Sequence, residues 1–452
     1  MKTYQDFLES IDNKESFIEQ AILEFKCSDT YTNGIDAQAY YRGDNTSILA
    51  RTPYIFTEKG KVEDVTKANN KIPTNFLNYI VTQEASTLLS NGLQTNDDIK
   101  AGLGGNKFDI LLMKLSLYAL VDGVAWAYNY IDTSKKNAFQ TDIWRGTEFI
   151  PLFDEQTSEL KGGIRFYQLD VNKPMYIELY ELDGMSKYVI GKDGEGKSVT
   201  NLLQEKKAYN IKIESDGIGE RVIDEFNWSL LPIAPLYANE IKQSVFTKSF
   251  KAKNDLYDII LSDFGNNLED SRDVYWVLKN YGGQDLGEFI EQYKKYKAIK
   301  VGMDGEATPQ TIEIPYEARD TALKMIEASI YKESMSLDTS TLTGSSLNTT
   351  AIKASADALN KKVDKFEWEV QELCENIINL YLEHTGEKDK DYTINFIRSG
   401  LTNDTEIIDN LMKVRDEISD ETFYKNLPFV ENAKKEIEAV EQKDSRKFNI
   451  EE

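Results

Sequence analysis

The chain has few of the residues on which most familiar enzyme and metal sites depend. Its 452 residues include one histidine, His384, and two cysteines, Cys27 and Cys374. A single histidine excludes most nucleophile–histidine catalysis and most histidine-ligated metal sites. The two distant cysteines form neither a disulfide framework nor a zinc pattern, so a reducing cytosol is the expected setting. We therefore expect no catalytic residue, no cofactor and no bound metal.

Positive charge and long apolar runs are also scarce. The chain has 53 Lys and Arg against 77 Asp and Glu, a formal charge of −24, which disfavours general binding to nucleic acid or to an anionic membrane. The most apolar stretch, residues 111–131, contains Lys114 and Asp122, whereas a membrane-spanning helix needs about 20 nearly uncharged residues. The first ten residues lack the basic start and apolar run of a signal peptide. We expect no membrane segment.

The composition is that of a folded globular protein. Hydrophobic residues make up 40% of the chain and aromatic residues 11%, and there are only 9 prolines. A disordered acidic chain would have fewer hydrophobic and aromatic residues and more prolines. At roughly 150 residues per domain, the length allows about three domains with sizeable cores.

The first half predicts helices followed by a meander of short antiparallel strands. Apolar residues at helical spacing predict amphipathic helices over residues 4–25 and 107–121. A helix between them is predicted to begin after Asn69-Asn70, with Pro73 in its first turn, and to end at Asn91-Gly92. Runs rich in Tyr, Ile and Val, bounded by Gly or Asp, predict strands over residues 125–131, 139–152, 163–170, 175–182, 187–190, 209–213 and 221–228.

The second half predicts two helical stretches, residues 242–268 and 316–337, with a compact insert between them. The insert could form the tip of a helical hairpin. Its predicted elements are strands over residues 274–278, 298–301 and 310–314 and a helix over residues 286–296.

An uncharged segment, residues 339–350, precedes the longest predicted helix. It has the composition of a loop, in a chain of which 29% is charged. The helix that follows, residues 352–381, would be about 45 Å long. Its apolar residues, spaced alternately by four and three, predict one buried face, packed against the chain's own core or against a second copy in a coiled coil. These residues are Leu359, Val363, Phe366, Val370, Leu373, Ile377 and Leu380.

Residues 191–198 spell the phosphate-binding pattern G-x-x-x-x-G-K-S. A phosphate cradle needs a buried parallel strand before the loop and a helix that begins at the lysine. The preceding strands are amphipathic here, and Asp193 and Glu195 would direct negative charge at a phosphate. A polar hairpin tip therefore explains the pattern better, although a nucleotide hydrolase using Lys197 and Ser198 remains an alternative.

The one local cluster of positive charge consists of Lys242, Lys248, Lys251 and Lys253, with no acidic residue between Ile241 and Asn254. In a monomer such a cluster is most simply a solvated helix face. In a ring the same face would be repeated around an axis. His384 lies near the end of the long helix, where a residue able to carry positive charge is favoured without any catalytic role.

The order of these parts resembles that of the portal proteins of tailed double-stranded DNA bacteriophages, in the branch typified by siphophages of Gram-positive hosts. No single string is decisive, and the resemblance rests on their order over nearly the whole chain. The resembling segments are Ala68–Phe76 with Ile80-Val81, Ser262–Asp270, Val277–Gly283, Phe396–Ser399, Ile418–Thr422 and Asn426–Val430.

The resemblance implies a ring of twelve identical subunits at one capsid vertex, through whose channel DNA is packaged and later ejected. It also implies partners. These are further copies of the chain, double-stranded DNA, the terminase large subunit, the major capsid and scaffolding proteins, and a head–tail adaptor, with no membrane partner. ATP hydrolysis would then belong to the terminase.

The resemblance further implies an α+β subunit with a helical wing that includes an antiparallel β region. Residues 1–241 correspond to the wing, 242–270 and 316–338 to paired stem helices, 271–315 to a small α/β clip, 351–402 to a long wing helix and strand, and 403–452 to a helical crown. The stem lysines Lys242, Lys248, Lys251 and Lys253 become candidates for a positive band near DNA. The tunnel loop facing DNA would comprise Thr339, Ser340, Thr341, Leu342, Thr343, Gly344, Ser345, Ser346, Leu347, Asn348, Thr349 and Thr350.

Overall fold

The computed structural model describes the greater part of the chain and has a mixed α+β fold with antiparallel sheets. The chain divides into two compact units. The first comprises Met1–Thr82, Leu117–Tyr130 and Thr141–Ser334, and the second comprises Gln83–Ser116, Ile131–Gln140 and Met335–Glu452. The described residues are 2–57, 60–64, 67–135, 137–192, 198–215, 220–270, 275–279, 306–310, 316–342, 349–399, 404–427 and a few single positions beyond.

The first unit begins with a run of helices. The predicted single helix over residues 4–25 is wrong, because the chain forms α1 (Tyr4–Glu9), one 3-10 turn (Ile11–Asn13) and then α2 (Lys14–Lys26). Ser10, Asp12 and Asn13 favour turns over helix interiors and so separate the two helices. Two further helices, which the apolar pattern did not indicate, are α3 (Asp29–Tyr41) and α4 (Thr46–Leu49), capped by Ser28 and Asn45.

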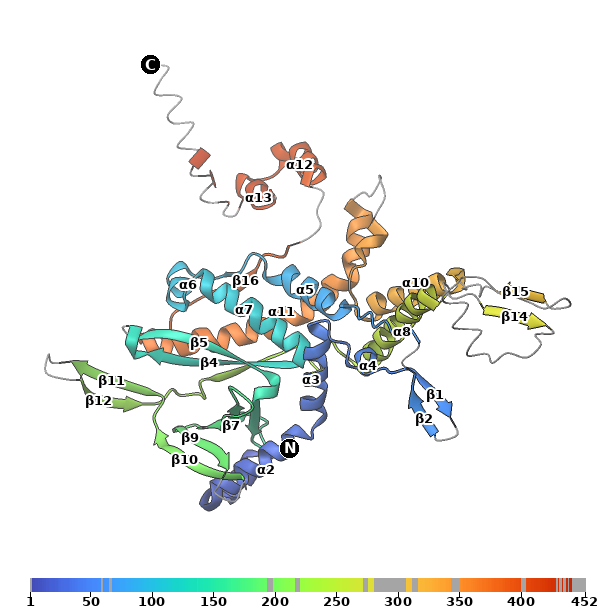
Figure 1. The fold of residues 1–452 in the computed structure, drawn as a ribbon. Coiled ribbons are helices and arrows are strands. Elements are labelled where there is room, and N and C mark those ends of the chain that lie inside the picture. The colour runs from blue at the N-terminus through green and yellow to red at the C-terminus, as the bar shows by residue number, and fades with distance from the viewer. Residues whose placement is uncertain are drawn as a thin grey trace. The chain divides into compact units, whose positions relative to one another are not determined.

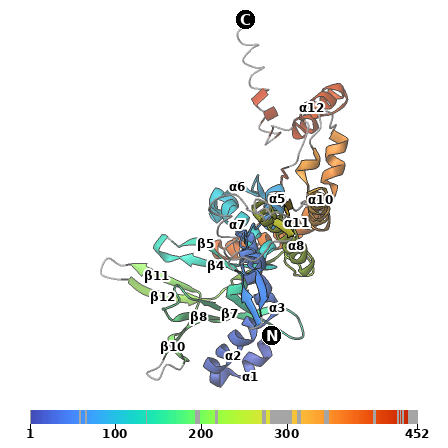
Figure 2. The same cartoon turned by 45° about the vertical axis from the view of Figure 1, so that its right-hand side comes forward.

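The predicted antiparallel meander is confirmed in part, by a five-stranded sheet in the order β10-β9-β8-β7-β6, in which β10 was not predicted; the other predicted strands form a separate sheet and a hairpin. Apolar side chains of α1 and α2, among them Phe7, Phe17 and Phe25, pack with Ile164 and Leu179 of the sheet in one core, and the helices lie against the sheet in Figure 2. The strands are β6 (Phe149–Phe153), β7 (Leu160–Tyr167), β8 (Met175–Glu181), β9 (Gly184–Lys192) and β10 (Ser198–Lys207).

A three-stranded sheet in the order β13-β4-β5 accompanies the meander. The predicted strand over residues 139–152 is divided by a 3-10 turn (Gly146–Glu148), where Arg145 pairs with buried Asp122 at 2.8 Å. A Cβ at Gly146 would lie 2.5 Å from the Val124 carbonyl oxygen, so this turn requires glycine. The strands are β4 (Val124–Asp132), β5 (Ala138–Arg145) and β13 (Ile233–Tyr237), with a separate hairpin of β11 (Asn210–Ser215) and β12 (Glu220–Phe226).

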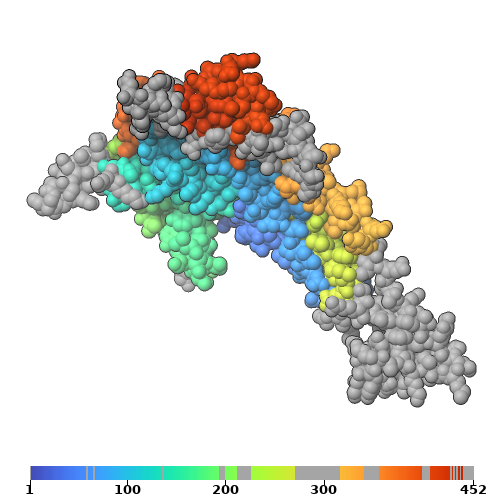
Figure 3. All heavy atoms as spheres, turned by 90° about the horizontal axis from the view of Figure 1, so that it is seen from above, coloured from blue at the N-terminus to red at the C-terminus, as the bar shows by residue number. Residues whose placement is uncertain are grey.

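Two long helices of the first unit flank the predicted insert. α8 (Lys248–Asp270) and α10 (Tyr316–Glu333) pack side by side (Figure 1), with β1 (Tyr54–Thr57) and β2 (Gly60–Glu63) as a hairpin nearby. In Figure 3, yellow-green α8 lies between blue residues of the N-terminal segment and orange α10. Of the insert, the structure describes β14 (Tyr275–Lys279) and β15 (Glu306–Gln310), which pair antiparallel. The predicted helix over residues 286–296 and strand over 298–301 fall outside the described residues.

The second unit is built on the predicted long helix, which is α11 (Thr349–Thr385). All seven residues of its apolar seam are at most 5% exposed within the single chain. The coiled-coil dimer is therefore wrong, because the chain's own core already covers the seam. The same unit contains the last part of α5 (Phe76–Leu89), from Gln83 on, and the first part of α7 (Asn106–Asp122), up to Ser116. It also contains α6 (Asp97–Leu103), the short pair β3 (Leu93–Gln94) and β16 (Asn395–Phe396), and the C-terminal helices α12 (Asp404–Lys413) and α13 (Asp420–Lys425).

The boundaries of two predicted helices move for identifiable reasons. α5 begins at Phe76 and not near Asn70, because residues 70–74 are extended along α8. α8 begins six residues later than expected, because a turn that closes from Lys242 N–H to the Asn239 carbonyl at 2.9 Å precedes it. Within the described part of the chain, no helix is both long and apolar enough to cross a bilayer.

Candidate functional site

Two of the resembling segments, Ala68–Phe76 and Ser262–Asp270, contact each other in the first unit. Backbone N–H groups of Asn70, Ile72 and Thr74 donate in turn to Asn266 Oδ1 at 2.6 Å, Ser262 Oγ at 3.0 Å and Asp258 Oδ1 at 3.1 Å. Four residues of helix rise about 6.0 Å, close to the 6.6 Å that two extended residues span. We name residues 70–74 the strap. Every fourth side chain of α8 can therefore meet every second backbone N–H group of the strap.

Asp258 is the centre of this contact. Its side chain is fully buried and accepts hydrogen bonds from Thr74 N and Oγ1, from Asn45 Nδ2 at 2.6 Å and from Asn254 Nδ2 at 2.9 Å. Burial raises the pKa of the Asp258 carboxyl, an effect that the donors from Thr74 and Asn45 oppose. The cluster links the strap, the loop before α4 and helix α8, and so fixes α8 to the rest of its unit.

Sequence reasoning did not single out this cluster, although a signal for it exists. Asn254, Asp258 and Ser262 recur every four residues and are each at most 1% exposed. A polar stripe at helical spacing inside an otherwise apolar and charged helix indicates a buried polar face that needs partners. The pattern does not say where those partners lie in the chain.

The four candidate stem lysines differ sharply in their surroundings. Lys251 Nζ lies 3.3 Å from Asp36 Oδ2 and donates to Tyr40 Oη at 3.0 Å, and Lys253 forms an ion pair with Glu333 of α10. The Lys242 ammonium lies 4.3 Å from the centre of the Tyr237 ring. Lys248 forms no ion pair with any residue that the structure describes, and it opens α8. Three of the four positive charges are thus engaged within the subunit.

Lys242 and Lys248 also line one hollow of the first unit. The cavity has a volume of about 540 Å³. It is bordered as well by Asp29 and Asp122, so its walls carry both signs of charge. Asp122 is already paired with Arg145. With walls of mixed charge, the hollow favours binding of neither cations nor anions.

The structure describes only the ends of the uncharged segment 339–350. Thr339–Leu342 form one 3-10 turn, in which Ser340 N–H donates to Asp338 Oδ1 at 2.9 Å, and Thr349 and Thr350 begin α11. Thr343, Gly344, Ser345, Ser346, Leu347 and Asn348 lie outside the described residues. The assignment of this segment as a tunnel loop stays a prediction.

The nucleotide hydrolase alternative is wrong. Ser198, the last residue of the pattern, begins strand β10 and pairs with Lys192 of β9 in an antiparallel ladder. A phosphate cradle needs a helix at this point, whose N-terminal N–H groups would face the anion. The segment joins two hairpin strands, as a polar hairpin tip would, and residues 193–197 lie outside the described part of the chain.

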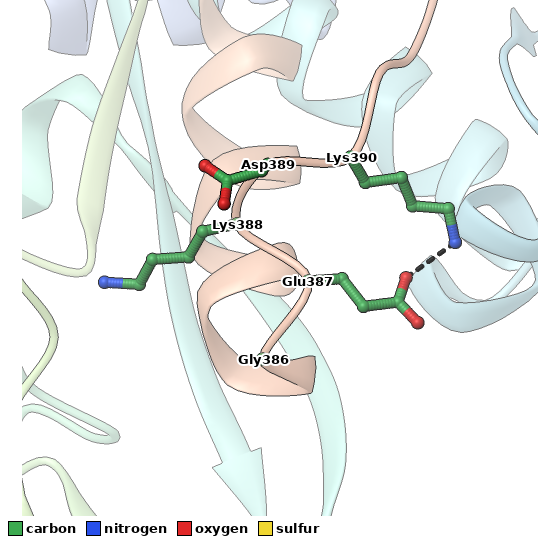
Figure 4. Close-up of a pocket in the computed structure, with 5 residues that line it drawn as sticks. All are labelled: Gly386, Glu387, Lys388, Asp389 and Lys390. Atoms are coloured by element: carbon green, nitrogen blue, oxygen red, sulfur yellow. Dashed lines mark hydrogen bonds and ion pairs between the residues drawn. The ribbon is translucent and has the colours of Figure 1, made fainter.

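Another surface hollow, in the second unit, is bordered mostly by charged residues. Figure 4 shows it at the turn after α11, where five consecutive residues, 386–390, border it and their side chains point in different directions. Glu387 pairs with Lys390 at 2.6 Å, so both charges are already balanced. Among the residues that the structure describes, no group of three histidine, cysteine, aspartate or glutamate side chains is placed to hold a metal ion.

Two C-terminal resembling segments have evident structural roles. Arg398 pairs with Asp364 at 2.5 Å and with Glu367, both on α11, while Ser399 N–H donates to the Thr87 carbonyl of α5 at 2.8 Å. Ser419 caps α13 by accepting from Thr422 N–H at 3.3 Å. His384 Nε2–H donates to the Asn137 carbonyl at 3.1 Å, because a carbonyl oxygen can only accept.

Sequence comparison with known proteins identifies one family. A family described as phage portal protein, SPP1 Gp6-like, matches residues 29–447. The chain is 24% identical over 427 residues to the portal protein of Clostridium phage phiCD119, covering 88% of this chain and 89% of that one. It is also 24% identical over 423 residues to the portal protein of Bacillus phage SPP1, covering 89% and 82%. A solved virion of a native gene transfer agent particle aligns with a TM-score of 0.41 and 10% identity over 90% of this chain and 92% of that one.

Proposed function

The chain belongs to the SPP1 Gp6-like family of phage portal proteins, which are not enzymes, and from that premise we propose that it closes into a ring, with twelve copies as the expected number, at the capsid vertex where DNA enters and leaves. The observation that carries the proposal is the family match over residues 29–447, which includes the two long helices, the insert and the uncharged segment. α8 and α10 would be the stem, residues 271–315 the clip and residues 339–350 the tunnel loop.

The electrostatics of the subunit suit a conduit. Each phosphate that a fixed cation neutralises releases counterions, and the free energy gained would hold DNA at that step. The chain has a formal charge of −24, and with Lys251, Lys253 and Lys242 engaged inside the subunit its basic cluster keeps little free positive charge to hold the duplex. Like charge on a channel wall acts over about 8 Å at physiological salt and would keep DNA centred.

We assign the docking roles by the same premise. The terminase large subunit and later the head–tail adaptor would bind the clip, while the major capsid and scaffolding proteins would bind the wing. Only β14 and β15 of the clip are among the described residues, so the test of docking has to be made with the whole chain. Deletion of residues 280–305 is expected to abolish terminase binding. The ring should still be incorporated into the capsid.

The proposed tunnel loop is tested by adding charge to it. Thr341→Lys or Ser345→Lys would place a ring of cations around DNA and is expected to slow packaging in a reconstituted head-filling assay, because each lysine can hold a phosphate. Thr341→Asn and Ser345→Asn are the matched uncharged controls, and they should package at the parent rate. Equal rates for the lysine and asparagine variants would contradict the loop's role.

A further inference from the structure

We infer that two adjacent residues of α5, Gln83 and Glu84, position both flanks of the uncharged segment 339–350, an inference that rests on the proposed function for its role in transport. All the residues involved belong to the second unit. Gln83 holds the chain just before the segment, at Leu337, and Glu84 holds α11, the helix that begins at the end of the segment, at Lys362.

Gln83 forms a two-point contact with the backbone of Leu337. Its side-chain Nε2 donates to the Leu337 carbonyl at 3.0 Å, and Leu337 N–H donates to its Oε1 at 2.8 Å. The amide thus pairs with Leu337 as a neighbouring strand would. Leu337 is only 7% exposed, and a buried backbone group without a partner is costly. Gln83 satisfies both backbone groups at a position two residues before Thr339.

The path from Leu337 into the segment is also specified locally. Met335 has a φ of 51°, in the left-handed region that non-glycine residues seldom adopt, so the chain turns sharply there. Asp338 then accepts from the N–H and the hydroxyl of Ser340, at 2.9 and 2.6 Å, which begins the 3-10 turn. With Leu337 held by Gln83 between these two features, the direction in which the chain enters the segment is fixed.

Glu84 holds the other flank through charge. Its carboxylate Oε2 lies 2.6 Å from Lys362 Nζ on α11, and the side chains of Glu84 and Lys362 are 1% and 18% exposed. Lys362 lies between Leu359 and Val363, which are both buried. An ion pair in such low-dielectric surroundings tolerates little displacement, because separating the charges leaves one of them buried alone.

The two contacts share one turn of one helix. Consecutive residues of a helix project about 100° apart, since a turn contains 3.6 residues. One stretch of α5 can therefore hold two chain segments that lie on different sides of it. A force that a moving duplex exerted on residues 339–350 would reach α5 from both flanks, and α5 would resist displacement of either one.

The test uses Gln83→Ala in the full chain, with Thr82→Ala, an exposed neighbour on the same helix, as the matched control. Amide hydrogen exchange is measured over residues 335–342, and packaging rate is measured in heads that contain each variant. We expect exchange of the Leu337 amide to become roughly tenfold faster in Gln83→Ala, because a hydrogen bond of ordinary strength is lost. Packaging should slow, while ring assembly and both properties of Thr82→Ala stay unchanged.

The outcomes separate this inference from the proposed function. Unchanged exchange in Gln83→Ala would overturn the positioning role, whatever the packaging rate. Faster exchange with normal packaging would overturn its importance for transport, provided that Thr341→Lys slows packaging in the same assay. If neither Gln83→Ala nor Thr341→Lys affected packaging, the assignment of the tunnel loop itself would fail.

Discussion

A single carboxylate oxygen of Asp258 accepts both the backbone N–H and the side-chain hydroxyl of Thr74, at 3.1 and 2.6 Å. This contact joins helix α8 to the strap, residues 70–74. Its consequence is that α8 does not depend on apolar packing alone for its place in the first unit. Three side chains of α8, those of Asp258, Ser262 and Asn266, hold three alternate N–H groups of the strap.

Removing the Asp258 carboxylate should therefore be costly. Asp258→Ala leaves several buried donors without an acceptor, and we expect the free energy of unfolding to fall by about 3 kcal/mol, measured by urea denaturation. Asp263→Ala is the matched control on the same helix, because Asp263 pairs with Arg51 at the surface, where an ion pair contributes about 1 kcal/mol or less. Equal losses in the two variants would show that the strap contact does not stabilise the subunit.

Charge reversal in the basic cluster should have different effects at different positions. Lys251→Glu places a carboxylate beside Asp36 and removes a donor to Tyr40, so we expect a loss of roughly 1–3 kcal/mol in stability, measured by thermal or urea unfolding. Lys248→Glu should leave stability within about 0.5 kcal/mol, because Lys248 has no ion pair with any described residue.

This difference decides which lysine can test a role near DNA. A packaging or retention defect in Lys251→Glu would be confounded by the damaged fold, whereas one in Lys248→Glu would report on DNA directly. Lys248→Gln serves as the neutral control. If Lys248→Glu, Lys248→Gln and the parent retain DNA equally, Lys248 has no part in the positive band proposed for the stem.

The buried pair of Glu84 and Lys362 predicts an asymmetric response to mutation. Lys362→Met leaves the Glu84 carboxyl buried without its cation and should cost about 3–5 kcal/mol near neutral pH. Glu84→Gln should cost less, because the amide oxygen of glutamine can still accept a hydrogen bond from the Lys362 ammonium. The double variant should recover much of the loss, and denaturant unfolding of all four proteins measures the coupling.

The same pair predicts a pH dependence. Burial raises the pKa of the Glu84 carboxyl above its value in the unfolded chain, about 4.3, with Lys362 opposing the shift. Between the two pKa values the unfolded state binds fewer protons than the folded state, so stability falls as pH rises through that window. Lys362→Met removes the opposing cation and should steepen the fall. A pH profile parallel to that of the parent would contradict the buried pairing.

Much of the secondary structure could be predicted because it follows from local periodicity. The apolar seam of α11 from Leu359 to Leu380 predicts a buried helix face. The short strand patterns of β6–β9 predict an antiparallel meander. What the seam could not specify was its partner. The choice between the chain's own core and a second copy is a tertiary property, and only the structure shows that the seam is filled.

The errors have a common physical origin. Pro73 suits the first turn of a helix, but residues 70–74 are extended because α8 offers acceptors to their N–H groups. Lys251 and Lys253 look like a free positive face, yet Asp36 and Glu333, which pair with them, are far away in sequence. Nothing in the sequence around Gln83 predicts its role, because that role depends on a contact with the backbone of Leu337, which is far away in sequence.

The account rests on the assembly of this subunit around DNA, and a reconstruction of filled phage heads without imposed symmetry measures that most directly. We predict a closed ring at one vertex, with α8 and α10 of each copy forming the wall of the stem and the segment 339–350 of each copy nearest the axis. A ring at that vertex built from another protein, or this chain present only as separate subunits, would contradict the account.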